Sequence, residues 1–154
     1  MNRVVFWLAA VLFVSGAARA AAVCTVSTSG IAFGSFNPLP GQSADTNGTI
    51  SVTCTGTPGD STNYTVTVSQ GLGSFAQRKM TSGTDILSYN LYRDSSCTQV
   101  WGDGSGSTYS IADTMTLSST SNSRNYVVYS RIASGQNAAK ARIYSDNVLV
   151  TITY

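Results

Sequence analysis

The 154-residue sequence contains no histidine and no glutamate, and only 10% of its residues are charged. Histidine is the most frequent general base and a common metal ligand, so its absence excludes Ser-His-Asp and Cys-His catalytic sites. All seven acidic residues are aspartates, and Asp60, Asp94 and Asp103 each lie beside glycine or serine. Aspartates in such contexts form turns by accepting hydrogen bonds from nearby backbone, so we interpret them as turn formers rather than as a carboxylate pair that cleaves sugars. We therefore expect no enzymatic activity, no cofactor and no metal site.

Long hydrophobic runs are also scarce, and the one clear example lies at the N-terminus, at residues 4–14. Arg3 precedes this run, and the small residues Ala18 and Ala20 follow it, which is the pattern of a secretory signal peptide with an A-x-A cleavage site. The run is shorter than the roughly 20 residues that span a bilayer. We predict a signal peptide at 1–20, with cleavage after Ala22 as an alternative, and one exported domain at 21–154 without a transmembrane segment.

Net charge is also lacking once this signal peptide is removed. Arg3 and Arg19 leave with it, so seven of the nine basic residues remain to balance seven aspartates. A chain of about zero net charge has no basic surface of the kind that binds nucleic acid or anionic lipid. We expect neither as a partner.

The three cysteines lie at positions 24, 54 and 97, in a chain predicted to reach an oxidising compartment. Cys24 and Cys54 are the preferred disulfide pair, because each lies on a candidate strand and a loop of this length contributes roughly 3 to 4 kcal/mol by the loop-entropy estimate. Pairing of Cys54 with Cys97 is the alternative. In the preferred arrangement Cys97 stays single in a polar loop, where it is buried, exposed as a thiol or bonded to another chain.

Helical periodicity is absent beyond the signal peptide, whereas runs with strand-like alternation recur along the chain. We predict strands at about 31–36, 49–55, 63–69, 87–93, 114–118, 125–132 and 147–154, separated by turns rich in Gly, Pro, Asp and Asn. Alternation predicts which side chains share a buried face, and the three such sets are Ile50, Val52 and Cys54; Tyr64, Val66 and Val68; and Leu87, Tyr89 and Leu91. Many short strands in one domain predict an all-β sandwich.

The last stretch of the sequence, 144–154, carries the clearest alternation. Val148, Val150, Ile152 and Tyr154 fall at every second position and are predicted to face one side, with Leu149, Thr151 and Thr153 on the other. Nothing follows this stretch in the sequence that would form a hairpin with it. We expect its partner strand to come from elsewhere, and another chain is one source.

Two further features have residue types that also occur in binding sites. W-G-D-G-S-G at 101–106 lacks the following helix of a nucleotide site and the further oxygen ligands of a calcium loop, so we interpret it as a turn with Trp101 as a packing residue. A set of tyrosines predicts either ordinary sheet packing or, in a self-contained adhesin-like module, a stripe that binds carbohydrate or surfaces. These tyrosines are Tyr89, Tyr92, Tyr126, Tyr129 and Tyr144.

Taken together, the motifs resemble the spore coat protein U family, which includes subunits of archaic chaperone-usher pili. The matching motifs are Cys24 soon after the signal peptide, Phe33-Gly34, G-x-I-x-V-x-C at 48–54, Y-x-V-x-V at 64–68, Y-N-L-Y at 89–92, W-G-D-G at 101–104 and Y-x-D-x-V-x-V-x-I-x-Y at 144–154.

This resemblance implies an immunoglobulin-like β-sandwich that lacks its last strand and is completed by a strand from another chain. The implied partners are a periplasmic chaperone, an outer-membrane usher and other pilus or coat subunits, and the implied location is the cell surface or the secreted fraction. Val148, Val150, Ile152 and Tyr154 would then line the groove for the chaperone or donor strand.

One feature departs from a polymerising subunit of this family. Only Ala21, Ala22 and Val23 lie between the predicted cleavage site and Cys24, and three residues span at most about 10 Å. A segment of that length is too short to fill a groove. We therefore expect a subunit that accepts a donor strand without giving one, as a terminal subunit or a coat component would.

Overall fold

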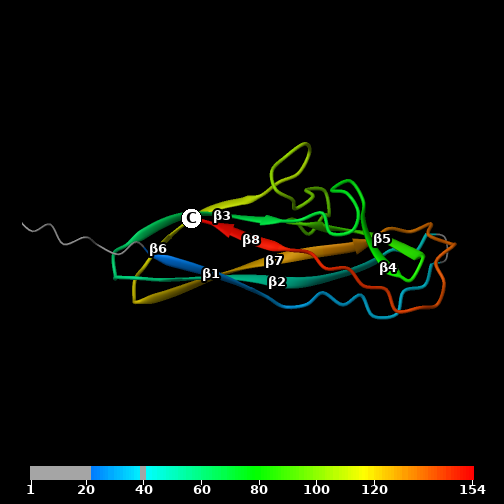
Figure 1. Cartoon of the computed structure of the whole chain (residues 1–154), viewed down its shortest axis with the longest axis horizontal. Coiled ribbons are helices and arrows are strands. Elements are labelled where there is room, and N and C mark those ends of the chain that lie inside the picture. The colour runs from blue at the N-terminus through cyan, green and yellow to red at the C-terminus, as the bar shows by residue number, and fades with distance from the viewer. Residues whose placement is uncertain (1–21, 39–40) are drawn as a thin grey trace, which may run out of the picture.

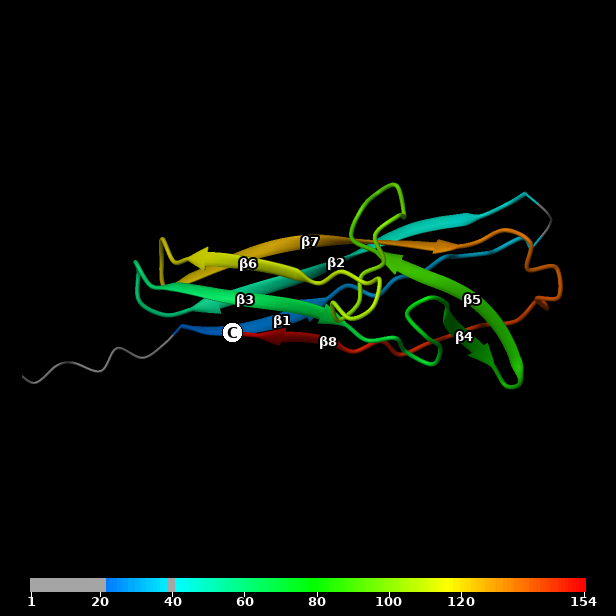
Figure 2. The ribbon, with the colours of Figure 1, turned by 90° about the horizontal axis from the view of Figure 1, so that it is seen from above.

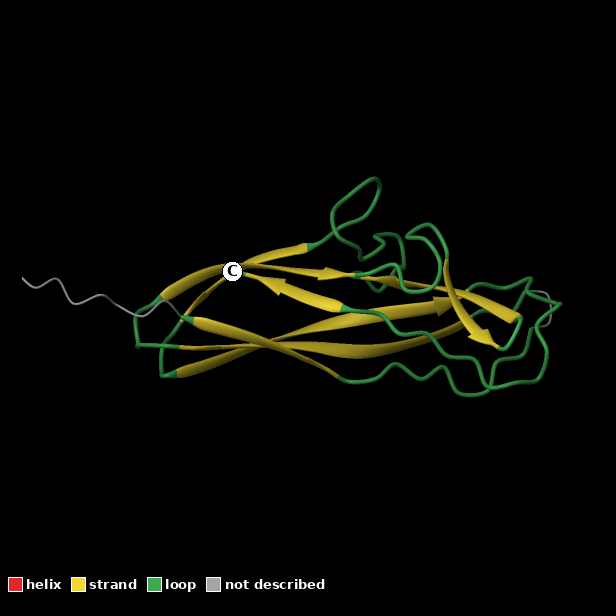
Figure 3. Ribbon diagram, in the orientation of Figure 1, coloured by secondary structure: helices red, strands yellow, loops and turns green. Residues whose placement is uncertain are grey.

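A computed structural model describes residues 22–38 and 41–154, so the predicted signal peptide at 1–20 lies outside the described residues. The described part of the chain consists of strands joined by loops and turns (Figure 3). Among the described residues, no helix is long and apolar enough to cross a membrane. The strands are β1 (Val23–Thr28), β2 (Ala44–Thr55), β3 (Ser61–Val68), β4 (Arg78–Ser82), β5 (Asp85–Tyr92), β6 (Ile111–Thr116), β7 (Ser121–Ile132) and β8 (Val150–Thr153).

These strands form two antiparallel sheets that face each other along an elongated molecule (Figure 1). The larger sheet has the order β1-β2-β7-β5-β4, and the smaller has the order β6-β3-β8. The long strands β2 and β7 pair over their full length, from Ala44 opposite Ile132 to Thr55 opposite Ser121. The architecture is the predicted all-β sandwich.

The core lies between the two sheets and is built from the alternating side chains that the sequence predicts. All three predicted faces are confirmed, since each of their nine side chains is buried. Trp101 is fully buried in the same core, where its indole N–H donates a hydrogen bond to the carbonyl of Val66 at 3.3 Å. The prediction that Trp101 is a packing residue is therefore confirmed, and the Oδ1 of Asp103 accepts a turn hydrogen bond from the Ser105 amide at 2.8 Å.

One predicted strand is wrong. Residues 31–36 form an irregular segment rather than a strand, because Gly30 precedes it and Gly34, whose φ of 67° is in the left-handed region, interrupts it. Its apolar side chains Ile31, Phe33 and Phe36 nevertheless pack against the core. The sequence predicts no span for β4, and it indicates β1 only as the candidate strand that carries Cys24.

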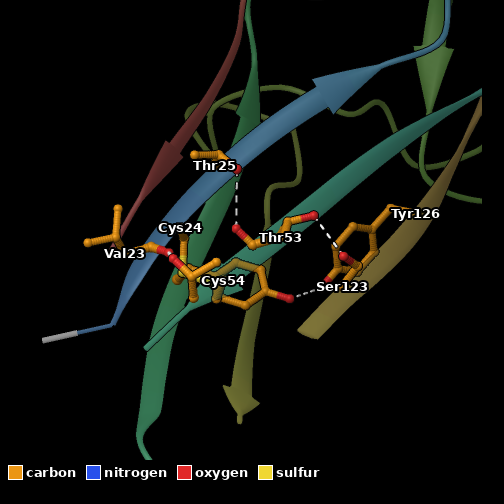
Figure 4. The surroundings of a disulfide bond; sticks show 9 residues. Val23, Cys24, Thr25, Thr53, Cys54, Ser123 and Tyr126 are labelled. Atoms are coloured by element: carbon orange, nitrogen blue, oxygen red, sulfur yellow. Dashed lines mark hydrogen bonds between the residues drawn. A yellow bond between two sulfur atoms is a disulfide. The ribbon is translucent and has the colours of Figure 1, made fainter. Parts of the chain in front are cut away.

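Cys24 and Cys54 form a disulfide between β1 and β2, which lie opposite each other in register (Figure 4). Both residues are buried, and the bond joins positions separated by 30 in the sequence. On the solvent side of the sheet, the hydroxyl of Thr53 on β2 shares a hydrogen bond of 2.7 Å with the hydroxyl of Ser123 on β7. Cys97 is a free, partly buried thiol in the loop after β5, and burial raises its pKa.

A charged side chain, Arg78 of β4, is fully buried beside this core. Its guanidinium donates to the carbonyls of Ser69 at 2.8 Å and Trp101 at 2.7 Å, and to the Asn90 side chain at 2.5 Å. Burial lowers the pKa of Arg78. These hydrogen bonds compensate the burial of the cation and tie β4, β5 and two loops together.

Candidate functional site

Two strand edges are open on one side of the sandwich. Within the described residues, β1 pairs only with β2 in the larger sheet, and β8 pairs only with β3 in the smaller sheet. The two strands are in contact and run in opposite directions next to each other (Figure 2). Their outward edges therefore present backbone groups that another strand can bind.

The strand β8 has the register that the alternation predicts. Val150 lies opposite Val68 and Ile152 opposite Val66 on β3. Val148, Val150 and Ile152 are half-buried and pack against the core, whereas the exposed fraction of Leu149 reaches 68%. Strand pairing begins at Val150 rather than at 147, but the carbonyl of Leu149 already accepts a hydrogen bond from the Ser69 amide at 2.8 Å.

Tyr154 is placed apart from the other three predicted groove residues. It follows the last residue of β8 and is 55% exposed. It lines a shallow surface hollow with Asn63 of β3 and Asp113 of β6. Its side chain is not among those that pack against the core.

Beside these edges, the domain opens as a groove made of two adjoining hollows, and the smaller of them reaches residues of both sheets. The larger has a volume of about 770 Å³ and the smaller about 350 Å³. One side of the groove, here called the N-terminal wall, consists of residues 28–36, and the opposite side, the C-terminal wall, consists of residues 139–150. The two hollows share four lining residues, which are Ile31, Phe33, Met80 and Tyr144.

Apolar core residues form the floor of this groove. Ile50, Val68, Leu91 and Val128 line the smaller hollow, and Leu87 and Ile132 line the larger one. These side chains are otherwise buried between the sheets. An apolar occupant would therefore extend the hydrophobic core of the domain.

The N-terminal wall, which the sequence analysis did not assign to a site, is attached to β2. The amide of Ser29 donates to the carbonyl of Thr49 at 2.9 Å, and the hydroxyl of Ser29 accepts from the Thr49 amide at 2.8 Å. Ile31 fits over Gly48, where a Cβ would lie 2.8 Å from its side chain. The alternation of Ile31 and Phe33 is the available signal, but alternation of this kind predicts a strand of the sheet.

The C-terminal wall is attached to β4 and β5. Thr81 and Ser145 exchange two backbone hydrogen bonds, of 2.9 and 3.1 Å. The carboxylate of Asp85 contacts both Lys140 at 2.7 Å and Arg142 at 2.6 Å, and the hydrogen bond from Lys140 is the main cause that lowers the pKa of Asp85. These contacts fix the wall in place without filling the groove.

The chemistry of the groove is that of a binding surface. The residues that the structure describes contain no cluster of three or more His, Cys, Asp or Glu side chains that could hold a metal ion. The tyrosines of the alternative stripe do not all gather on one surface. Tyr89 and Tyr144 line the groove, whereas Tyr129 alternates with the buried Val128 and Ser130 of β7 and so faces the other way. An extended apolar segment, by contrast, would meet both an apolar floor and open strand edges.

A two-sheet antiparallel sandwich with such a groove beside its last strand is a pilin-like fold. The chain belongs to the Spore Coat Protein U domain family, which matches residues 9–151.

Among solved structures, the fold is similar to a chain in the crystal structure of the CsuC-CsuE chaperone-tip adhesion subunit pre-assembly complex from archaic chaperone-usher Csu pili of Acinetobacter baumannii. The TM-score is 0.58 at 22% sequence identity, and the match covers 86% of this chain and 40% of that chain. This chain therefore spans well under half of the matched chain's length. A comparison with curated proteins gives no match.

Proposed function

We propose that this protein is an exported structural subunit of a surface fibre or coat, assembled by accepting a strand from another chain. The observation that carries the proposal is the pair of open edges, β1 and β8, which adjoin a groove whose floor is the hydrophobic core. An extended strand placed there would gain backbone hydrogen bonds from the edges and would bury alternate side chains. Each large apolar side chain buried in this way contributes about 1.5 to 3 kcal/mol.

The partners proposed for this groove are a periplasmic chaperone first and a neighbouring subunit later. The similar solved structure is a complex between a chaperone and a tip adhesion subunit of a chaperone-usher pilus, which supports a chaperone as the first partner. The predicted signal peptide at 1–20 supports export through the periplasm, where such a chaperone would meet the chain. An outer-membrane usher would then mediate the exchange of partners.

The same proposal assigns the chain an acceptor role. Val23 already belongs to β1, where it lies opposite Thr55, and is therefore committed to the chain's own sheet. Only Ala21 and Ala22 would remain before this strand if the signal peptide ends at Ala20. N-terminal sequencing of the exported protein tests this role, since a mature chain that retains residues before Ala21 would contradict it.

The experiment for the proposed function compares the exported chain with and without a co-expressed periplasmic chaperone of the chaperone-usher class. With the chaperone, we expect a soluble one-to-one complex from the periplasm. Without it, we expect aggregation, because the open edges and the apolar groove are exposed. A monomer that unfolds cooperatively at high temperature in the absence of any partner would contradict the proposal and favour a self-contained binding module.

A further inference from the structure

Tyr89 of β5 connects the two walls of the groove. Its ring lies on the floor of the smaller hollow and is only 7% exposed. Phe33 of the N-terminal wall packs against this ring in an edge-on contact, with centroids 6.1 Å apart and an interplanar angle of 73°. On the other side, the hydroxyl of Tyr89 donates a hydrogen bond of 2.8 Å to Oδ2 of Asp146 in the C-terminal wall.

Asp146 in turn joins this tyrosine to a third element, the loop between β3 and β4. Its Oδ1 accepts hydrogen bonds from the Leu72 amide at 3.2 Å and the Asn147 amide at 2.8 Å. Gly71 makes room for the carboxylate, because a Cβ on Gly71 would lie 2.2 Å from Oδ2. The loop and the wall are therefore shaped around one carboxylate.

From these contacts we infer that Tyr89 and Asp146 form a brace that fixes the distance between the two walls and keeps the C-terminal wall in place while the groove is empty. The inference rests on the proposed function, since it assigns a positioning role within the same groove. At the even positions of 144–154, Asp146 is the one residue that is neither aliphatic nor aromatic, and strand pairing gives it no role. Its contacts supply one.

The brace has a physical consequence for binding. If the C-terminal wall is ordered before a strand arrives, the entropy of ordering it is not subtracted from the binding free energy. A wall that lacks the brace opens more often, and its backbone amides then exchange with solvent more readily. A variant without the brace should therefore show two changes together. Its C-terminal wall should open more often in the empty chain, and its affinity for an extended segment should be weaker.

The test uses Tyr89→Phe and Asp146→Ala in the mature chain, with Tyr129→Phe as the matched control on the other face of the same sheet. Hydrogen-deuterium exchange of the empty chain, freshly refolded at low micromolar concentration to limit aggregation, is measured at 145–149, with the buried strand β3 as internal reference. We expect exchange at 145–149 to accelerate roughly ten- to 150-fold in both variants, the range for loss of one hydrogen bond to a charged acceptor. Tyr129→Phe and the reference strand should show no change.

Two more measurements separate a positioning role from a general loss of stability. Asp146→Asn keeps an acceptor for the backbone amides and a polar partner for Tyr89, so exchange at 145–149 should return close to that of the unmodified chain. Affinity for a short synthetic peptide of alternating valine and threonine with lysine ends should fall about tenfold in Tyr89→Phe and Asp146→Ala. Asp146→Asn should bind nearly as tightly as the unmodified chain.

The outcomes are distinguishable. Exchange at 145–149 that is unchanged in both Tyr89→Phe and Asp146→Ala, or a failure of Asp146→Asn to restore it, overturns the brace. Accelerated exchange in a protein whose unmodified form binds no peptide and no chaperone supports the brace and contradicts the proposed function. Faster exchange that appears equally in β3 shows global destabilisation and also overturns the positioning role.

Discussion

The hydroxyl of Tyr126 on β7 donates a hydrogen bond of 2.6 Å to Oδ2 of Asp113 on β6, and this bond joins the two sheets on the side away from the groove. Because the single proton of Tyr126 is used on Asp113, the hydroxyl of Tyr64 donates to Tyr126 at 2.5 Å. Arg124 forms an ion pair with the same Oδ2. The sandwich is therefore closed by polar contacts on one side and open on the other.

This cluster predicts a pH dependence of stability. The hydrogen bond from Arg124, followed by that from Tyr126, lowers the pKa of Asp113 from 3.8 to about 2. A lowered pKa means that the carboxylate stabilises the folded state above pH 4 and that this contribution is lost as the pH falls towards 2. Asp113→Asn should therefore lower the free energy of unfolding at pH 7 by about 1 kcal/mol, since Arg124 is half-exposed and screened by solvent.

Denaturant unfolding at pH 7 and pH 2.5 measures this effect. The difference between the unmodified chain and Asp113→Asn should shrink at the lower pH. A difference that stays constant across this range would show that Asp113 acts through packing and not through its charge.

Because the guanidinium of Arg78 is buried, even a conservative substitution at this position should lower the stability of the fold strongly. Arg78→Lys keeps the charge but loses the planar arrangement of donors that reaches the carbonyls of Ser69 and Trp101 and the side chain of Asn90. We expect the free energy of unfolding to fall by about 2 to 4 kcal/mol, because buried acceptors lose their partner. Thermal or denaturant unfolding measures the loss.

Arg131→Lys is the matched control for this change. Arg131 pairs with Asp45 through two hydrogen bonds, of 2.7 and 2.6 Å, but both side chains are more than a third exposed. An exposed pair contributes little, so the cost should stay below about 1 kcal/mol. Equal losses in the two variants would contradict the account of Arg78.

The disulfide predicts a further stability difference. Replacing both Cys24 and Cys54 with alanine should lower the free energy of unfolding by roughly 3 to 4 kcal/mol, the loop-entropy estimate for a separation of 30 residues. Cys97→Ser should leave stability nearly unchanged. Alkylation of the unfolded, unreduced protein followed by mass spectrometry should modify Cys97 alone, and modification of Cys24 or Cys54 would contradict this pairing.

The sequence predicts the strands whose buried faces are set by local alternation. It does not predict the parts of the structure that depend on contacts between residues far apart in the chain. Val150 and Ile152 alternate with threonines, so their common face follows from strand geometry alone. The strand β4 contains Arg78 and Lys79 and has little apolar character, and it exists because a tight turn at Gly83 pairs it with β5. Ile31 and Phe33 alternate in the same way as a strand but form a groove wall instead.

The candidate site likewise contains some residues that local alternation predicts and others that it does not. One wall of the groove includes Val148 and Val150, which the alternation predicts, whereas the other wall depends on how the segment after β1 lies on β2. The bond between Tyr89 and Asp146 joins residues 57 positions apart, and no local pattern indicates it. Tyr154 shares the alternation of Ile152, but the strand ends at Thr153 and leaves the tyrosine exposed.

The most direct test of strand acceptance replaces single residues of the last strand and measures co-purification with the chaperone. Val150 and Ile152 point into the domain beside the open edge, whereas Thr151 is exposed. An unpaired carboxylate on the inner face is incompatible with an apolar occupant, so Val150→Asp and Ile152→Asp should abolish capture and Thr151→Asp should preserve it. Closure of the Cys24–Cys54 disulfide in each variant serves as the control for folding. Capture that is lost in Val150→Asp and retained in Thr151→Asp is the predicted result, and equal capture, or equal loss, in all three folded variants would contradict it.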